Sequence, residues 1–199
     1  NTSVGRASME ENTTGDANVA VGNKALQKNT TADNNTAIGY FALNLNTTGA
    51  QNVAIGAEAL ESNQTGVDNT AIGYRALESN THSLNTAVGR SALQNNISGT
   101  QNTAMGKQAS FSNTTGNYND SYGFQALFYN TTGSKNTALG QSALANNTTA
   151  DNNTAVGYFA LLANTTGTTN VAVGSGALDA NTTGSQNAAL GYNSLGSNT

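Results

Sequence analysis

The titratable side chains that enzymes use for general acid–base catalysis are few in this chain of 199 residues, and most of them lie far apart. It has one histidine, His82, no cysteine and eleven acidic residues. The nearest acidic groupings are Glu10 with Glu11 and Glu58 with Glu61. General acid–base catalysis needs titratable groups that are held together with shifted pKa values. The sequence therefore predicts a non-enzyme without a cofactor, in which His82 fills a turn and the acidic groupings lie on a solvated face.

Metal, nucleic-acid and membrane binding are also disfavoured by the residue types. Asp33 and Asp151 recur in matching T-A-D-N-N-T segments, but one carboxylate per segment is too few for calcium. Without cysteine there is neither a zinc cluster nor a disulfide framework. The net charge is −4 with seven scattered Lys and Arg, and no apolar run approaches the roughly 20 residues of a membrane span. We expect no metal site, no nucleic-acid partner and no membrane span in this segment.

Asparagine side chains are the remaining candidates for chemical modification, because many of them begin an Asn-x-Ser/Thr sequon. In a secreted eukaryotic protein, sequons at exposed corners are acceptors for N-glycosylation. The other interpretation is that these residues form a structural column that happens to contain Asn-Thr-Thr, and the sequence favours this second interpretation. The ten candidates are Asn12, Asn29, Asn46, Asn63, Asn96, Asn113, Asn130, Asn147, Asn164 and Asn181.

A repeat organises the whole chain, residues 1–199, as a single repeat domain. A glycine closes a small apolar segment every 17 residues, and only the step from Gly73 to Gly89 is 16. Asn stands four residues before each of these anchor glycines and again seven residues after it. The consensus is N-[TV]-A-[VIL]-G-x-x-A-L-x-x-N-T-T-G-x-x. The twelve anchors are Gly5, Gly22, Gly39, Gly56, Gly73, Gly89, Gly106, Gly123, Gly140, Gly157, Gly174 and Gly191.

Each unit has the make-up of one coil of a parallel β-solenoid. It is too short for a helical repeat, and it offers two short ordered stretches separated by Asn- and Gly-rich corners that suit left-handed backbone. We therefore predict an all-β fold of twelve coils, each with two short strands and two turns. At the usual strand spacing the rod is about 55–60 Å long. Identical Asn in successive coils are expected to form hydrogen-bonded ladders.

The apolar pattern predicts a second buried face. Neighbouring residues of a strand face opposite sides, yet both members of Ala37–Ile38 and of Ala155–Val156 are apolar. One face thus carries bulky side chains and the other carries Ala, and one coil alone has a thin core. Because oligomers are usually symmetric, another copy of the chain is the expected cover. The pattern predicts a homo-oligomer without fixing the number of chains.

These units resemble the head repeats of trimeric autotransporter adhesins of the YadA type. Asn35-Thr-Ala-Ile-Gly39, Asn52-Val-Ala-Ile-Gly56 and Asn170-Val-Ala-Val-Gly174, each followed by Ala three residues on, carry the resemblance. It implies a left-handed β-roll wound as a homotrimer, with this strand near the threefold axis. The coils here are longer by the Asn-Thr-Thr-Gly corner, and no neck or stalk is present in the segment. Similar arrays also look like shafts of phage and giant-virus fibres, and the repeat alone does not separate the two families.

Aromatic residues gather where the repeat is least regular. Asp120-Ser-Tyr122 replaces T-A-V, and Ser110 replaces Leu. An exposed cluster there would suit a surface glycan or a host matrix protein, whereas the alternative is that Tyr122 replaces a core aliphatic residue and its neighbours repack. The six candidate binding residues are Phe111, Tyr118, Tyr122, Phe124, Phe128 and Tyr129.

Together these features predict an extracellular, cell-surface or virion-surface rod that spaces or presents a binding surface in adhesion. The alternatives are a viral or phage fibre shaft and a self-assembling filament, while an ice-binding solenoid is disfavoured because the Thr array is irregular. The segment starts at Asn1 without an initiator Met, stops inside a corner and lacks atypical capping units, so we expect it to be an excerpt of a longer chain.

Overall fold

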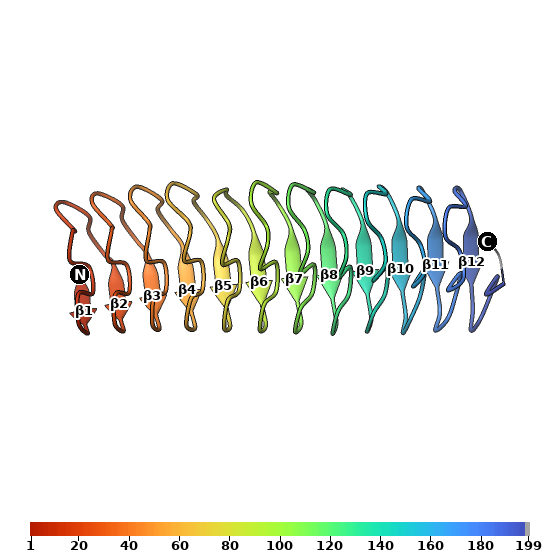
Figure 1. Ribbon diagram of the computed structural model, residues 1–199, viewed down its shortest axis with the longest axis horizontal. Helices are drawn as coiled ribbons and strands as arrows, with labels where there is room; N and C mark the ends of the chain where they lie inside the picture. The colour runs from red at the N-terminus through yellow and green to blue at the C-terminus, as the bar shows by residue number, and fades with distance from the viewer. Residues whose placement is uncertain (198–199) are drawn as a thin grey trace.

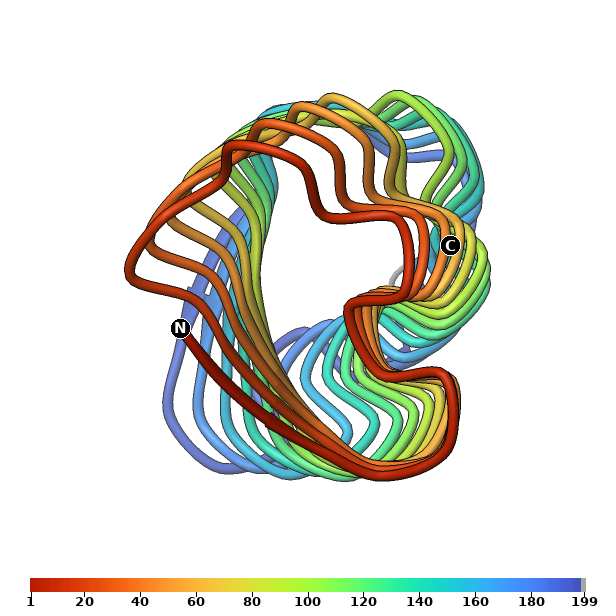
Figure 2. The ribbon, with the colours of Figure 1, turned by 90° about the vertical axis from the view of Figure 1, so that its left-hand side faces the viewer.

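The computed structural model describes residues 1–197 and forms a parallel β-solenoid (Figure 1). Twelve strands of three residues stack in chain order into one parallel sheet, so the predicted all-β solenoid with a repeat of about 17 residues is confirmed. Viewed from its N-terminal end, the stack turns gradually from coil to coil (Figure 2). The strands are β1 (Thr2–Val4), β2 (Val19–Val21), β3 (Thr36–Ile38), β4 (Val53–Ile55), β5 (Thr70–Ile72), β6 (Thr86–Val88), β7 (Thr103–Met105), β8 (Asp120–Tyr122), β9 (Thr137–Leu139), β10 (Thr154–Val156), β11 (Val171–Val173) and β12 (Ala188–Leu190).

The strands pair at equivalent repeat positions along the whole sheet. Ala37 of β3 lies opposite Ala54 of β4, and Ile38 lies opposite Ile55. The pairing survives the 16-residue coil, because Thr70 still lies opposite Thr86. The missing residue is therefore absorbed by a corner and not by the sheet.

The two faces of the sheet differ in burial. The central Ala of a strand, such as Ala37, points inward and is fully buried, whereas the aliphatic residue after it, such as Ile38, points outward and stays 38% exposed. This follows from the alternation of side chains along a strand. The prediction that both faces are buried thus holds in the single chain only for the Ala face.

The predicted second strand of each unit is wrong, because the segment after the anchor glycine forms two consecutive turns. The carbonyl of Gly39 accepts a hydrogen bond from the N–H of Ala42, and the carbonyl of Leu43 accepts one from Asn46. Phe41 and Leu43 have φ of +56° and +50°. Side chains of both Ala42 and Leu43 consequently reach the interior, where they are fully buried.

Left-handed backbone occurs, as expected, in the corner directly before the first Asn column, for example at Asn34, whereas the described Asn of the two columns do not adopt it. It also occurs at the Leu position. Leu43 is one example, and its counterparts in other coils share the conformation. Such a residue costs about 1–2 kcal/mol relative to ordinary backbone. Burying the Leu side chain returns roughly 1.5–3 kcal/mol, so packing offsets the backbone cost.

The anchor glycine is required by both conformation and space. Gly56 has φ of +133°, and a Cβ there would lie 2.6 Å from the carbonyl of Gly73 in the next coil. Any side chain would push neighbouring coils apart, which explains the strict recurrence of glycine at the end of the strand.

The apolar interior consists of inward Ala and Leu and is interrupted once. Between Ala109 and Ala126 the Leu position holds Ser110 and the Ala position holds Ser121, both buried. Their hydroxyl oxygens lie 2.9 Å apart, in hydrogen-bond contact, and Ser121 Oγ is also 3.2 Å from the carbonyl of Thr103. The two polar substitutions therefore satisfy each other inside the core.

The first Asn column, four residues before each anchor, ties each coil to the next. Oδ1 of Asn35 accepts the backbone N–H of Asn52 at 3.0 Å, and Nδ2 of Asn35 donates to the corner carbonyl of Gly49 at 2.9 Å. Asn35 and Asn52 are fully buried. The predicted structural role of this column is confirmed.

Candidate functional site

The ten sequon asparagines form a second ladder inside the corner. Nδ2 of Asn46 donates to Oδ1 of Asn29 at 3.0 Å and to the corner carbonyl of Gly49 at 2.8 Å. Both amide hydrogens are thereby committed. Asn12 is half-buried and the other nine are buried: Asn29, Asn46, Asn63, Asn96, Asn113, Asn130, Asn147, Asn164 and Asn181.

The premise that this corner exposes its Asn side chains is therefore wrong. A glycan would be attached to Nδ2, the atom that makes both ladder and corner hydrogen bonds. The ladder interpretation is confirmed for the described residues, whereas glycosylation itself stays a prediction that treatment with an N-glycosidase would test. Asn198, the last member of this column by sequence, lies outside the described residues.

Only three of the six candidate aromatic residues come together. The rings of Phe111 and Phe128 stack with centroids 5.2 Å apart, and Tyr129 meets Phe128 edge-on at 4.6 Å. Phe111 and Phe128 occupy the same repeat position in neighbouring coils, which explains their contact. Tyr129 is exposed, whereas the other two are half-buried.

The other three candidates stand at other positions of the coil. Tyr122 follows inward Ser121 and lies opposite Met105 and Leu139, so it belongs to the outward face of the sheet and does not replace a core residue. Tyr118 lies in the corner before β8, and Phe124 lies directly after the anchor glycine. Both are exposed. The predicted six-residue cluster is therefore at most a three-residue one.

The acidic grouping of Glu58 and Glu61 is half-buried, not solvated as expected. Arg75 from the next coil contacts the Glu58 carboxylate at 2.5 Å and the Glu78 carboxylate at 3.7 Å. Burial, with added repulsion from Glu58 and Glu78, raises the pKa of Glu61 above its ordinary value. Carboxylate oxygens of Glu58, Glu61 and Glu78 all lie within 4.8 Å of one another, but Arg75 already compensates part of their charge.

The N-terminal acidic grouping is paired across coils. Lys28 contacts the Glu11 carboxylate, and this hydrogen bond raises the pKa of Lys28 above its ordinary value. Gln27 donates to Glu10 at 2.5 Å. Both contacts join residues that are 17 apart and so reinforce the stack.

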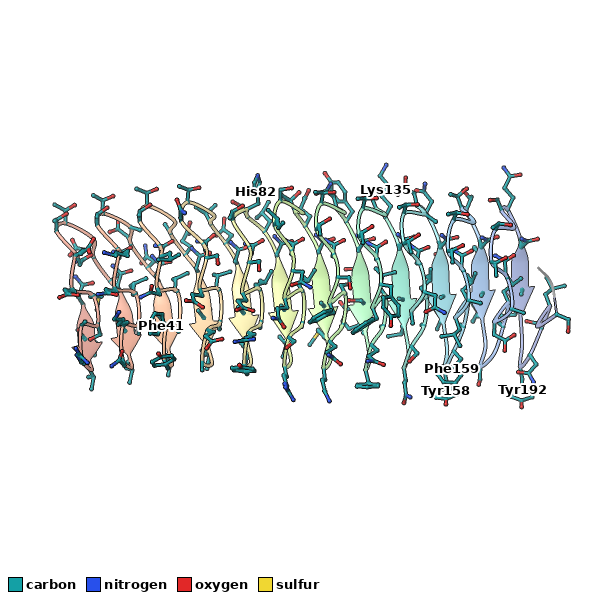
Figure 3. All side chains as sticks on the ribbon, viewed as in Figure 1. Phe41, His82, Lys135, Tyr158, Phe159 and Tyr192 are labelled. Carbon is teal, nitrogen blue, oxygen red and sulfur yellow. The ribbon has the colours of Figure 1, made fainter. Side chains whose placement is uncertain are left out.

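His82 has a structural position in the 16-residue coil. Its backbone carbonyl takes the place of the usual corner carbonyl and accepts hydrogen bonds from Asn80 at 2.6 Å and from Asn69 at 2.9 Å. The exposed imidazole is in contact with the Thr81 hydroxyl, with Nδ1 3.0 Å from Oγ1. His82 and Lys135 lie along the same edge of the rod (Figure 3).

Asp33 and Asp151 also act within the stack. Oδ1 of Asp33 accepts the backbone N–H of Asp16 at 2.7 Å, and Oδ1 of Asp151 accepts that of Ser134 at 2.6 Å. Each carboxylate therefore caps a backbone donor of the preceding coil.

The longest candidate surface is the outward side of the sheet. The residue before each anchor glycine forms a column, which we call the aliphatic column and which is aliphatic except at Tyr122. Its exposed fraction is 36% at Ile55 and 46% at Leu139, whereas valines such as Val88 are half-buried. The sequence signal was the apolar pair in each strand, which alone does not say which member faces out. The column consists of Val4, Val21, Ile38, Ile55, Ile72, Val88, Met105, Tyr122, Leu139, Val156, Val173 and Leu190.

Comparison of the chain with protein-family models, with curated proteins and with solved structures finds no match. Within residues 1–197, no pocket is present and no helix is both long and apolar enough to cross a membrane. The surfaces described above therefore have to be interpreted from their own geometry.

Proposed function

We propose that this chain is a non-enzymatic, extracellular structural rod, the head or shaft of a trimeric surface adhesin or fibre. The observation that carries the proposal is the aliphatic column, which runs along the outward side of the whole sheet. Its residues are paired at equivalent positions from β1 to β12. Exposed apolar patches of this length mark protein–protein interfaces.

A second copy of the chain is the partner that such a column fits. Every coil places an apolar residue at the same outward position, so a symmetric copy presents a matching row at the same spacing. The resemblance to YadA-type heads favours three copies, a left-handed winding and this strand near the threefold axis. A phage or giant-virus fibre shaft of the same build is the alternative setting, on a virion instead of a cell surface.

The proposed interface is tested with Ile38→Thr, Ile55→Thr and Ile72→Thr in one chain. Thr keeps the strand propensity of a β-branched residue and removes most of the apolar surface. Light scattering after size exclusion is expected to give a trimer mass for the parent. The triple variant is expected to be a monomer, or a trimer that dissociates at a concentration at least tenfold higher.

A matched control removes exposed aliphatic residues outside the column. Leu45→Ser and Ile97→Thr introduce residues that other coils hold at these positions, and the parent side chains are 38% and 52% exposed. The control is expected to remain a trimer. A monomeric parent would contradict the proposal, and open-ended assemblies would favour a filament instead.

A further inference from the structure

A second row of side chains runs along the rod, at the position directly after each anchor glycine. We call this row the corner column. It carries five aromatic residues, and every one is exposed, between 40% for Tyr74 and 79% for Tyr192. Tyr158 and Tyr192 lie along one edge of the rod in Figure 3, away from the edge that carries His82. The five are Tyr40, Tyr74, Phe124, Tyr158 and Tyr192.

The aromatic rings of the corner column are spaced in whole coils. Two coils separate Phe124 from Tyr158 and Tyr158 from Tyr192, and two coils also separate Tyr40 from Tyr74. Only Tyr74 and Phe124 are three coils apart. Since parallel strands lie about 4.8 Å apart, the usual step between rings is about 9.6 Å.

Small or polar residues fill the coils between the rings. Gln141 stands between Phe124 and Tyr158, and Ser175 stands between Tyr158 and Tyr192. The longer gap holds two cations, Arg90 and Lys107. The column is therefore not a continuous apolar strip like the aliphatic column, but a row of separate rings with hydrogen-bonding groups between some of them.

Neighbouring aromatic side chains support two rings of the row, Tyr158 and Tyr40. Phe159 stacks against Tyr158 with centroids 3.9 Å apart, and Phe41 lies 4.4 Å from Tyr40. Each pair widens the apolar platform at its own point of the row, and Figure 3 shows Phe159 beside Tyr158.

Cations add donors near the middle rings. Arg75 lies 5.1 Å from the centroid of Tyr74, and Lys107 lies 5.5 Å from that of Phe124. Each platform in this part of the row therefore has a charged hydrogen-bond donor beside it.

We propose that the corner column binds an extended β-1,4-linked glycan, of the cellulose or chitin type, laid along the rod axis. In such a chain the apolar C–H face of the sugar turns to the same side at every second residue. Its disaccharide repeat is close to twice the spacing of parallel strands, which is the step from Tyr40 to Tyr74 and the step along Phe124, Tyr158 and Tyr192. Aromatic rings pack against those apolar faces, and Gln141, Ser175 and Arg90 face the hydroxyl groups between them.

The spacing of the rings selects the β-1,4 linkage over other glycan linkages. An α-1,4-linked glucan or a β-1,3-linked glucan coils, so its sugar faces do not repeat along a line at the step of two coils. The inference rests on the proposed function of an exposed rod, but it concerns a different column from the proposed trimer interface. The trimer proposal is tested by molar mass and the glycan proposal by glycan binding, so either can fail while the other holds.

The test removes three rings with Tyr40→Ser, Tyr74→Ser and Tyr158→Ser. Ser175 shows that the column accepts Ser, so the fold is expected to be unchanged by urea unfolding. The parent chain is expected to be depleted from solution by insoluble cellulose or chitin and retarded by hydroxyethyl cellulose in native gels. The triple variant is expected to bind at least tenfold more weakly.

A control removes three aromatic residues elsewhere, with Phe111→Gln, Phe128→Gln and Tyr129→Ser. Gln27 and Ser112 occupy the same repeat positions in other coils. This variant is expected to bind as the parent does. Equal loss in both variants would assign binding to general aromatic content and overturn the proposal.

A spacing variant is the sharpest test. Tyr158→Ser combined with Ser175→Tyr keeps the number of rings but changes the two two-coil steps between Phe124 and Tyr192 into one of three coils and one of one coil, so that only Tyr40 and Tyr74 keep the two-coil step. Glycan binding is expected to fall as far as it would if the Tyr158 ring were removed without replacement. Unchanged binding, equal binding of amylose, or no binding of any β-1,4-glycan by the parent would overturn the proposal. Loss of the trimer in the Tyr→Ser variant would identify the column as an interface between copies instead.

Discussion

The side-chain amide of Asn80 makes no hydrogen bond to Oδ1 of Asn63 in the coil before it. Every other neighbouring pair in the second Asn column is hydrogen-bonded within residues 1–197, for example Asn96 to Asn80 at 2.7 Å. Asn80 instead donates to the carbonyl of His82 at 2.6 Å, and the buried Oδ1 of Asn63 has no partner in the described part of the chain. The 16-residue coil thus leaves one gap in the ladder.

Lengthening that corner should repair the gap. Insertion of one Gly between His82 and Ser83 restores a 17-residue coil and lets Asn80 reach Asn63. Because an unsatisfied buried acceptor costs about 1–3 kcal/mol, we expect the free energy of unfolding to rise by ~1–2 kcal/mol in urea titrations. A Gly inserted between Gly133 and Ser134, where the ladder is intact, should instead destabilise the rod. A lower stability of the His82 insertion would contradict this interpretation.

The ladder can also be broken in a matched pair of adjacent residues. Nδ2 of Asn147 donates to Asn130 at 2.9 Å and to the carbonyl of Ala150 at 3.0 Å. Its Oδ1 accepts from Asn164 at 3.0 Å. We expect Asn147→Ala to cost ~2–4 kcal/mol of unfolding free energy, since buried partners on both sides lose their hydrogen bonds.

The control for this variant is Asn146→Ala, one residue earlier. The chain already holds Ala163 at the same position of the next coil. Asn146→Ala should change the free energy of unfolding by less than about 0.5 kcal/mol. Similar urea midpoints for the two variants would count against the ladder as a source of stability.

The polar interruption of the core should be replaceable. Ser110→Leu with Ser121→Ala restores the residues that other coils hold, and it exchanges a hydrogen-bonded pair for apolar packing. Burying the Leu side chain is expected to raise the free energy of unfolding by roughly 1–3 kcal/mol. Each single substitution removes one partner of the pair, so a double-mutant cycle should show non-additivity. Additive effects would mean that the two hydroxyl groups are not coupled.

The half-buried Glu61 should make stability depend on pH. Its pKa is raised in the folded chain, mainly by burial, so the folded state holds this proton more tightly than the unfolded state does. The resulting cost is absent below the ordinary pKa of Glu and grows as pH rises through the raised pKa. Glu61→Gln is therefore expected to stabilise the chain by ~0.5 kcal/mol or less at about pH 7 and to have no effect at about pH 3.

Glu58→Gln should destabilise the chain at neutral pH, unlike Glu61→Gln, because Glu58 is in contact with Arg75. Removing that carboxylate should lower the urea midpoint at neutral pH, since Arg75 loses this partner. If Glu61→Gln destabilised the chain at neutral pH, the assignment of burial as the dominant cause would be wrong.

The repeat made the architecture predictable, because identical residues recur in phase and must stack in register. The 17-residue period placed β3 and β4 opposite each other, and the Asn columns indicated their ladders. The backbone between Gly39 and Asn46 was not predictable in the same way. Leu43 gives no local signal for left-handed backbone, and its conformation is imposed by the need to fill the interior.

The candidate site is less predictable, because residues that are close along the chain can lie at different positions around the coil. Phe111 and Tyr118 are close in sequence but belong to different columns. Tyr40 and Tyr74 are 34 residues apart, yet they stand in the same column. The sequence signal for this column is the shared offset of its residues from the anchor glycine.

The backbone hydrogen bonds between coils determine how the rod carries load. Parallel strands donate to their neighbours along the stacking direction, so a tensile force applied between the two ends passes through every junction between coils in series. Each junction bears the same force, and the one with the fewest contacts yields first. At the junction between the coils of Asn63 and Asn80 one ladder hydrogen bond is missing, so more of the load there falls on the backbone pairing of β4 with β5 and on the ion pair of Arg75 with Glu58.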